Sequence, residues 1–309
     1  MIHQFRFSLV IIYLIGGFTV GILSSASAIA MEYDSWKRIL ELGELPERIV
    51  ATLPSTTEIL FELGLNTRIV AVTSLTGHLG YVPRIKRMAD KKDKIGKFNI
   101  SMETLVETGP DLIVLDRMAQ PELLARIKRR KFPVYPAESG SLNKVTETIL
   151  QLGQLTGTLS RARTIVGEMI RQKYVLREWV GKLDHRKRVL YAVSDGIYTT
   201  GGNTFLGEIL QLAGLVNIFQ DMDGWKKVSD EQIIKRNPEL IIIPQEAGMG
   251  IQTLKNRPGF HRIEAVQKQN ILILNIQETS RLSQPGTKIM DGAVRLFEKV
   301  YGIAIPMQK

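Results

Sequence analysis

Residues 101–115 read SMETLVETGPDLIVL, and residues 229–243 read SDEQIIKRNPELIII. At an offset of 229 − 101 = 128 positions, the two stretches share serine, glutamate, proline, leucine and isoleucine at matching places. In each, a serine suited to capping a helix comes first and a proline leads into branched apolar residues, which predicts a helix followed by a buried strand. Because this unit occurs twice, we predict an internal duplication with one copy in each of two lobes.

Further apolar runs of strand type surround both copies of this unit. These runs are RIVATL (48–53), RIVAVT (68–73), DLIVLD (111–116), FPVYPA (132–137), RVLYAV (188–193), ELIIIP (239–244) and ILILNI (271–276). Helical patterns alternate with them near 56–63, 101–108, 120–130, 142–156, 203–213, 229–236 and 286–301. Such alternation predicts an α/β protein with helices on both faces of parallel-rich sheets. We therefore expect two Rossmann-like lobes.

One long helical pattern separates the two sets of strands. Between Ser160 and Asp184, apolar residues recur with helical spacing and basic residues occupy the other face. A helix of that length spans roughly 37 Å, enough to connect two lobes. The predicted organisation is a signal peptide at 1–30, an N-terminal extension at 31–46, an N-terminal α/β lobe at 47–157, a linker helix at 158–185 and a C-terminal α/β lobe at 186–309.

The amino terminus has the three parts of a secretory signal peptide. Residues 1–7 carry Arg6 and no acid, residues 9–23 are apolar, and residues 24–30 read SSASAIA, which suits cleavage. The alternative is an uncleaved membrane anchor, for which this apolar run is short of the roughly 20 residues needed. We predict cleavage near Ala30 and export to a bacterial periplasm. The chain has no cysteine, and hence neither a disulfide nor a lipid-attachment cysteine.

The charge of the chain admits several kinds of partner. Lys and Arg number 41 against 31 Asp and Glu, a net charge of +10, which suits nucleic acid, an anionic membrane or an anionic ligand. The basic stretch 84–97 contains no aromatic residue, so it lacks the stacking platform of a single-strand binder. Export argues further against nucleic acid. We expect this stretch to be either solvated surface or a rim that attracts an anionic ligand or lipid headgroup.

Motifs of common enzymes are absent from the sequence. It contains no phosphate-binding loop, dinucleotide fingerprint, nucleophile elbow or zinc-protease helix, and cysteine chemistry is impossible. His78, His185 and His261 are scattered along the chain, and His78 is the candidate metal ligand among them. We predict that the protein is not an enzyme. An exported enzyme or metal-site protein using His78 and His261 stays as an alternative.

Ligand contacts are expected in the loops that follow the predicted strands. Open α/β sheets bind ligands beyond the carboxyl ends of their strands. The candidates at such positions are Ser55, Thr56, Tyr81, Arg117, Trp225 and Arg281. Aromatic rings and arginines together suit a large, partly apolar anion.

Several segments, in their order and spacing, carry a resemblance to a known family. They are PSTTEIL (54–60), YVP (81–83), SMETL (101–105), TGGN (200–203), LAGLVN (212–217), GWKKVSDEQ (224–232) and Pro285-Gly286. Over nearly all of 47–302, the chain resembles the periplasmic substrate-binding proteins of ABC importers for iron chelates, haem and vitamin B12. The resemblance implies a helix-linked bilobal monomer without catalysis or a cofactor of its own. It also implies an iron- or cobalt-containing ligand held between the lobes for delivery to a permease dimer with its ATPase.

The resemblance also implies roles for two repeated residues. The docking glutamates of the family, one per lobe, pair with permease arginines and match Glu103 and Glu231. A glutamate in the first turn of a helix interacts favourably with the helix dipole whatever its function. Its recurrence in both lobes is what a two-point contact with a symmetric permease dimer requires.

The ligand expected from the resemblance is an iron chelate or a similar large metal complex. Ligand contacts of the cobalamin-binding members match Tyr81, Trp225 and Arg281. Asp116 and Arg117 stand where those members have an aromatic residue, so cobalamin and haem are the alternatives. A basic membrane- or polyanion-binding protein, with steep salt dependence, is the remaining one.

Overall fold

The computed structural model describes residues 36, 43–97, 100–194 and 196–307. The predicted signal peptide and most of the predicted N-terminal extension lie outside these residues. In the part that is described, no helix combines the length and the apolar character needed to cross a bilayer.

The first lobe is built on a five-stranded parallel sheet with the order β3-β2-β1-β4-β5. Its strands are β1 (Ile49–Ala51), β2 (Ile69–Val72), β3 (Asp93–Lys94), β4 (Leu112–Asp116) and β5 (Val134–Ala137). Its helices are α3 (Pro54–Glu62), η1 (Thr76–Leu79), α4 (Pro83–Asp90), α5 (Met102–Thr108), α6 (Pro121–Arg129) and α7 (Leu142–Leu155). Alternate side chains of each strand enter different cores. Val50 and Ile113 pack with α5 and α6, whereas Ile49 and Val114 pack with α3 and α7.

The second lobe has a four-stranded parallel sheet with the order β11-β10-β6-β8 and a separate antiparallel pair, β7-β9. Its strands are β6 (Arg188–Tyr191), β7 (Tyr198–Thr200), β8 (Val216–Asn217), β9 (Trp225–Lys227), β10 (Leu240–Pro244) and β11 (Ile271–Leu274). Its helices are α9 (Phe205–Leu212), α10 (Asp230–Arg236), η2 (Gln245–Ala247), α11 (Ile251–Lys255), η3 (Phe260–Arg262), α12 (Glu264–Gln267), α13 (Ile276–Ser283) and α14 (Ile289–Tyr301).

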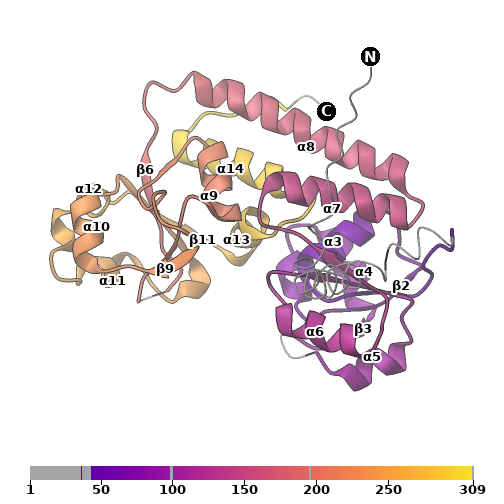
Figure 1. The fold of residues 1–309 in the computed structure, drawn as a ribbon. Helices are drawn as coiled ribbons and strands as arrows, with labels where there is room; N and C mark the ends of the chain where they lie inside the picture. Colours follow the sequence, from indigo (N-terminus) through magenta and orange to yellow (C-terminus); the bar gives the residue numbers. More distant parts are fainter. Residues whose placement is uncertain (1–35, 37–42, 98–99, 195, 308–309) are drawn as a thin grey trace, which may run out of the picture.

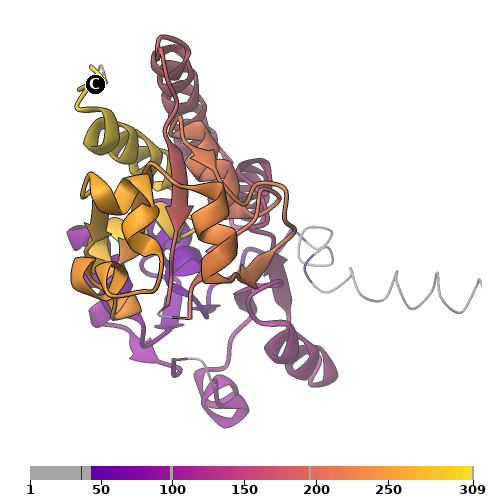
Figure 2. The same cartoon turned by 90° about the vertical axis from the view of Figure 1, so that its left-hand side faces the viewer.

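A single 23-residue helix, α8 (Leu159–Gly181), joins the lobes. It runs along the top of both lobes in Figure 1 and packs against α7, α9 and α14. Figure 2 views the molecule from the side of the second lobe, whose orange helices lie in front of the purple first lobe. The predicted fold class, two parallel-rich α/β lobes linked by one long helix, is confirmed.

The two copies of the repeated unit share their caps. Ser101 and Ser229 accept backbone hydrogen bonds at the starts of α5 and α10. Both helices end in a left-handed residue, at Gly109 and Asn237. These matched caps explain why so short a unit is recognisable in both lobes.

The strands that follow the repeated helices also pair in matching ways. β4 pairs with β1 and β10 with β6. Asp111 accepts a hydrogen bond from the backbone N–H of Arg48 just before β1, and Glu239 does the same for Arg188 at the start of β6. Each sheet is therefore organised around the same central helix-strand unit.

Candidate functional site

The carboxyl edges of the two sheets face each other. η1 follows the carboxyl end of β2 and α13 follows that of β11, and the two elements contact one another across the lobes. We call the contact of α3, η1 and Tyr81 with α13 and residues 284–288 the seam. The loops in which ligand contacts are predicted therefore surround the seam.

Glu58 of α3 lies at the centre of the seam and is fully buried. Its Oε1 accepts hydrogen bonds from Thr287 Oγ1 at 2.6 Å and from the Lys288 backbone N–H at 3.0 Å, and its Oε2 accepts one from the Tyr81 hydroxyl. The pKa of Glu58 is raised from the usual 4.5, because burial disfavours the ionised carboxylate. Hydrogen bonds from Thr287 and Tyr81 oppose this shift without cancelling it.

Glu58→Gln is expected to remove a pH dependence of stability. A carboxyl group whose pKa is raised on folding binds its proton more tightly in the folded chain. Its contribution to the free energy of unfolding is therefore complete below the unfolded pKa and declines as the pH rises through the raised folded value. Urea denaturation measures the free energy of unfolding of both proteins. The free energy for the wild type minus that for Glu58→Gln should fall as the pH rises above about 4.5. A difference that grows with pH would contradict this.

Four of the predicted ligand contacts lie in or beside the seam. Tyr81 is 8% exposed and donates to Glu58. The Arg281 guanidinium lies 5.5 Å from the centre of the Tyr81 ring, donates to the Tyr81 carbonyl at 3.1 Å and pairs with Asp291. Ser55 and Thr56 are buried in the first turn of α3. Tyr81 of the first lobe and Arg281 of the second thus contact each other. In this arrangement both side chains join the lobes.

The other two predicted contacts are accessible. Arg117 follows β4, and its Nη1 donates to Glu138 at 3.2 Å. Trp225 is 48% exposed and rests edge-on against the buried Tyr191, with ring centres 6.5 Å apart, at the carboxyl end of β6. Arg117 and Trp225 belong to different lobes, on the two facing sheet edges.

A second exposed aromatic ring accompanies Trp225. In the antiparallel pair, Tyr198 lies opposite Lys227 and Thr200 opposite Trp225, so these four side chains share one face of the ribbon. Tyr198 is 47% exposed and was not among the predicted contacts. The available signal was its position in the segment 198–205, which follows the predicted strand 188–193.

The two predicted docking glutamates occupy equivalent, exposed positions. Glu103 and Glu231 are each the second residue of their helix. The carboxyl ends of α5 and α10 accept hydrogen bonds from the side chains of Arg48, just before β1, and Arg188, at the start of β6. Both helices therefore begin toward the opposite, carboxyl edge of their sheets. The pKa of Glu231 is lowered by hydrogen bonds from its own backbone N–H and from the Ser229 hydroxyl. Among the described residues, neither carboxylate has a salt-bridge partner.

The histidines do not form a metal site in the described part of the chain. His78 lies in η1 with Nδ1 3.2 Å from Ser280 Oγ, across the seam, whereas His261 lies in η3 of the second lobe. No group of three or more His, Asp or Glu side chains among the described residues is arranged to hold a metal ion.

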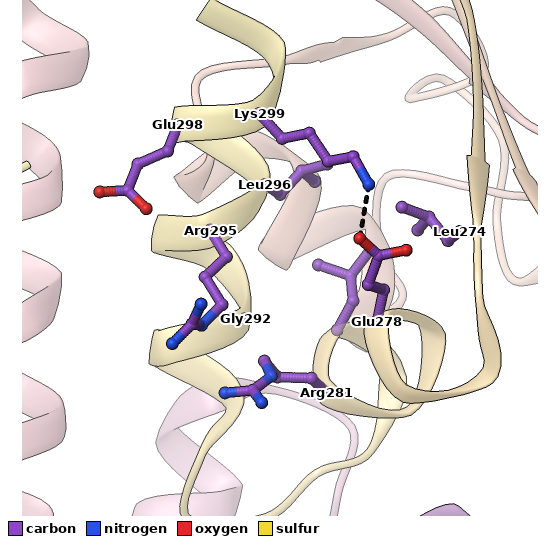
Figure 3. Close-up of a pocket in the computed structure, with 9 residues that line it drawn as sticks. Leu274, Glu278, Arg281, Gly292, Arg295, Leu296, Glu298 and Lys299 are labelled. Carbon is purple, nitrogen blue, oxygen red and sulfur yellow. Dashed lines mark hydrogen bonds and ion pairs between the residues drawn. The ribbon is translucent and has the colours of Figure 1, made fainter. Parts of the chain in front are cut away.

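A cavity of about 430 Å³ lies within the second lobe, between α13 and α14. Figure 3 shows its lining. The residues are Leu274, Glu278, Arg281, Leu282, Gly292, Arg295, Leu296, Glu298 and Lys299. The charged groups at its edge are largely paired with one another or with close neighbours, as Lys299 is with Glu278 at 2.5 Å. Trp225 and Arg117 do not line this cavity, so it is separate from the accessible predicted contacts.

The model of the periplasmic binding protein family matches residues 49–277. The chain belongs to this family. Its relatives include the ABC transporter substrate-binding lipoprotein YvrC of Bacillus subtilis, 27% identical over 276 residues, which are 87% of this chain and 84% of the relative. The cobalamin-binding protein of Halobacterium salinarum is 24% identical over 283 residues, or 89% and 74% of the two chains.

Among solved structures, one described as a possible iron-binding periplasmic solute-binding protein of Staphylococcus epidermidis superposes with a TM-score of 0.70. The sequences are 30% identical, over 84% of this chain and all of that one. Membership of the periplasmic binding proteins confirms that the chain is a solute-binding component of a transporter and not an enzyme. It also identifies the chain as extracytoplasmic.

Proposed function

We propose that this periplasmic binding protein captures an iron chelate or a similar large metal complex between its lobes and delivers it to an ABC importer. The observation that carries the ligand class is the exposed face of the β7-β9 ribbon. There Trp225, Tyr198 and Lys227 present two aromatic rings and one cation. Arg117, on the facing sheet edge, adds a second cation, which is also paired with Glu138. Rings and cations together favour a large, partly aromatic anion.

The names of similar proteins support a metal complex as the ligand. The Staphylococcus epidermidis protein is described as possibly iron-binding, and the Halobacterium salinarum relative as cobalamin-binding. A corrinoid is therefore the second candidate, and Trp225, Tyr81 and Arg281 would be its contacts. For Tyr81 and Arg281 to touch either ligand, the seam must expose them, whereas Trp225 is accessible as it stands.

The importer is the proposed partner, and Glu103 and Glu231 are the proposed contacts. Each carboxylate projects from the first turn of a helix at the carboxyl edge of its sheet. Neither is held in a salt bridge among the described residues, so both are available to permease arginines. We expect the protein to act as a monomer on the permease dimer with its ATPase, after export and cleavage near Ala30.

Native mass spectrometry and an absorbance spectrum of protein purified from its own periplasm test the ligand. An iron chelate would add its own mass and a broad visible absorption, whereas a corrinoid or haem would give its own narrower bands. The protein mass also tests the cleavage, because removal of 30 residues leaves 309 − 30 = 279. A ligand without metal would contradict the proposal.

A further inference from the structure

Glu58 of the first lobe binds the start of a helix in the second lobe. Its carboxylate accepts from Thr287 and from the backbone N–H of Lys288, which is the N-cap residue of α14. Lys288 makes no side-chain cap of its own. Glu58 therefore supplies, from the other lobe, an acceptor oxygen for the start of this helix.

Glu208 makes the reverse contact. It lies in α9 of the second lobe, and its Oε2 accepts a hydrogen bond at 2.8 Å from the backbone N–H of Leu142, the first residue of α7. α7 belongs to the first lobe, where Val145 and Ile149 pack with the sheet. Ser141 also caps α7, so Glu208 adds a second acceptor, from the opposite lobe.

The two glutamates are related within the sequence. Each stands in the triplet Glu-Ile-Leu, at 58–60 and 208–210, an offset of 208 − 58 = 150 positions. Each lies in the first helix after the first strand or strands of its lobe, and each reaches a helix near the end of the other lobe. The duplicated halves thus exchange one carboxylate each, as the two sides of a pseudo-symmetric interface do.

Gly286 of the second lobe packs closely against the Glu58 carboxylate. A Cβ added to Gly286 would meet the Glu58 carboxylate at 2.8–2.9 Å. The carboxylate is fixed by three donors, so it cannot yield as a free side chain would. If the lobes rotated apart, the donors of Thr287 and Lys288 would be left without partners, which is costly for buried groups.

We propose that Glu58 and Glu208 are positioning residues that set the orientation of the two lobes, and with it the separation of the facing sheet edges. α8 connects the lobes at one side of the molecule, and the two carboxylates connect them at the starts of α14 and α7. The lobes then behave as one body whether or not a ligand is bound. This inference does not depend on the identity of the ligand.

Spin labels on the two lobes test this inference directly. The chain has no cysteine, so Lys91→Cys on the first lobe and Lys235→Cys on the second provide two exposed labelling sites. Pulsed electron paramagnetic resonance on the labelled protein without further substitutions should give one narrow distribution of distances between the two labels. The Glu58→Ala/Glu208→Ala variant should give a broadened or shifted distribution, and Glu58→Gln, which keeps an acceptor oxygen, an intermediate one.

A matched variant separates positioning from simple stabilisation. Leu124→Ala opens a space in the core beneath α6, which lies within the first lobe, and should lower the melting temperature without broadening the distance distribution. An unchanged distribution in the double alanine variant would overturn the proposal. If the double alanine variant does not fold, Glu208→Ala alone is measured instead. In that variant α7 keeps its Ser141 cap, and an unchanged distance distribution would again overturn the proposal.

Discussion

Replacing Glu103 and Glu231 together with alanine is expected to abolish uptake of the ligand while leaving its binding to the purified protein unchanged. Both carboxylates are exposed at helix starts. Each carboxylate is expected to pair with an arginine of the permease, and removing one partner of such a pair weakens the complex and speeds its dissociation. Losing both contacts should weaken binding to the permease more than losing either one.

Uptake of labelled ligand by cells and calorimetric binding to the purified protein measure the two quantities separately. The control is Glu107→Gln/Asp184→Asn, which changes two other exposed acids, one on α5 and one after α8. This control should transport normally. Weaker ligand binding by the Glu103/Glu231 variant would show that these residues shape the binding site. Normal uptake by it would remove them from docking.

Trp225→Ala is expected to weaken ligand binding by about 2–4 kcal/mol, which is roughly 30- to 700-fold in affinity. Trp225 is a large ring that is exposed on one side and supported on the other by Tyr191. A ring held in this way loses little freedom when a ligand stacks on it, so most of its contact area contributes to affinity.

The same calorimetric titration measures this loss. Tyr174→Ala is the matched control, because Tyr174 is 64% exposed on α8 and belongs to neither sheet edge. It should bind the ligand as the wild type does. If Trp225→Ala also binds normally, the β7-β9 ribbon does not form part of the binding site. Tyr198→Phe should then have no effect either.

The main sheets were predictable because their strands are buried on both faces. Runs such as 111–116 and 239–244 contain mostly branched apolar residues, and the structure places β4 and β10 there. The repeated unit was recognisable because its caps, Ser101 and Ser229, are local signals. The linker helix was equally clear, since its apolar stripe continues without a proline.

Elements that depend on distant partners were not predictable. β9 is three residues long, all of its residues are exposed, and it is a strand through its pairing with β7. Arg281 is predicted in a loop after a strand, but it belongs to α13. This helix begins at the Asn275 cap and is polar enough to lack a helical apolar pattern.

The candidate site was predictable only where it depends on strand ends and not on distant partners. Trp225 and Arg117 follow from the rule that ligands bind beyond strand ends, and the structure leaves both accessible. The contact of Thr287 with Glu58, which also binds Tyr81, joins residues 229 positions apart. Nothing local in the sequence indicates it, although the triplets at 58–60 and 208–210 mark both glutamates.

The largest hydrophobic cluster has a consequence for how this chain acquires its structure. It continues from β1 and β4 through α7 and α8 into α9, α13 and α14, and so passes from one lobe to the other. An isolated first half would keep its cluster around α5 and α6 but would leave part of the apolar surface of α8 in water. Each half has one cluster of its own, whereas this shared cluster is complete only when both halves are present. During synthesis, the final packing of α8 must therefore wait for α14, close to the end of the chain.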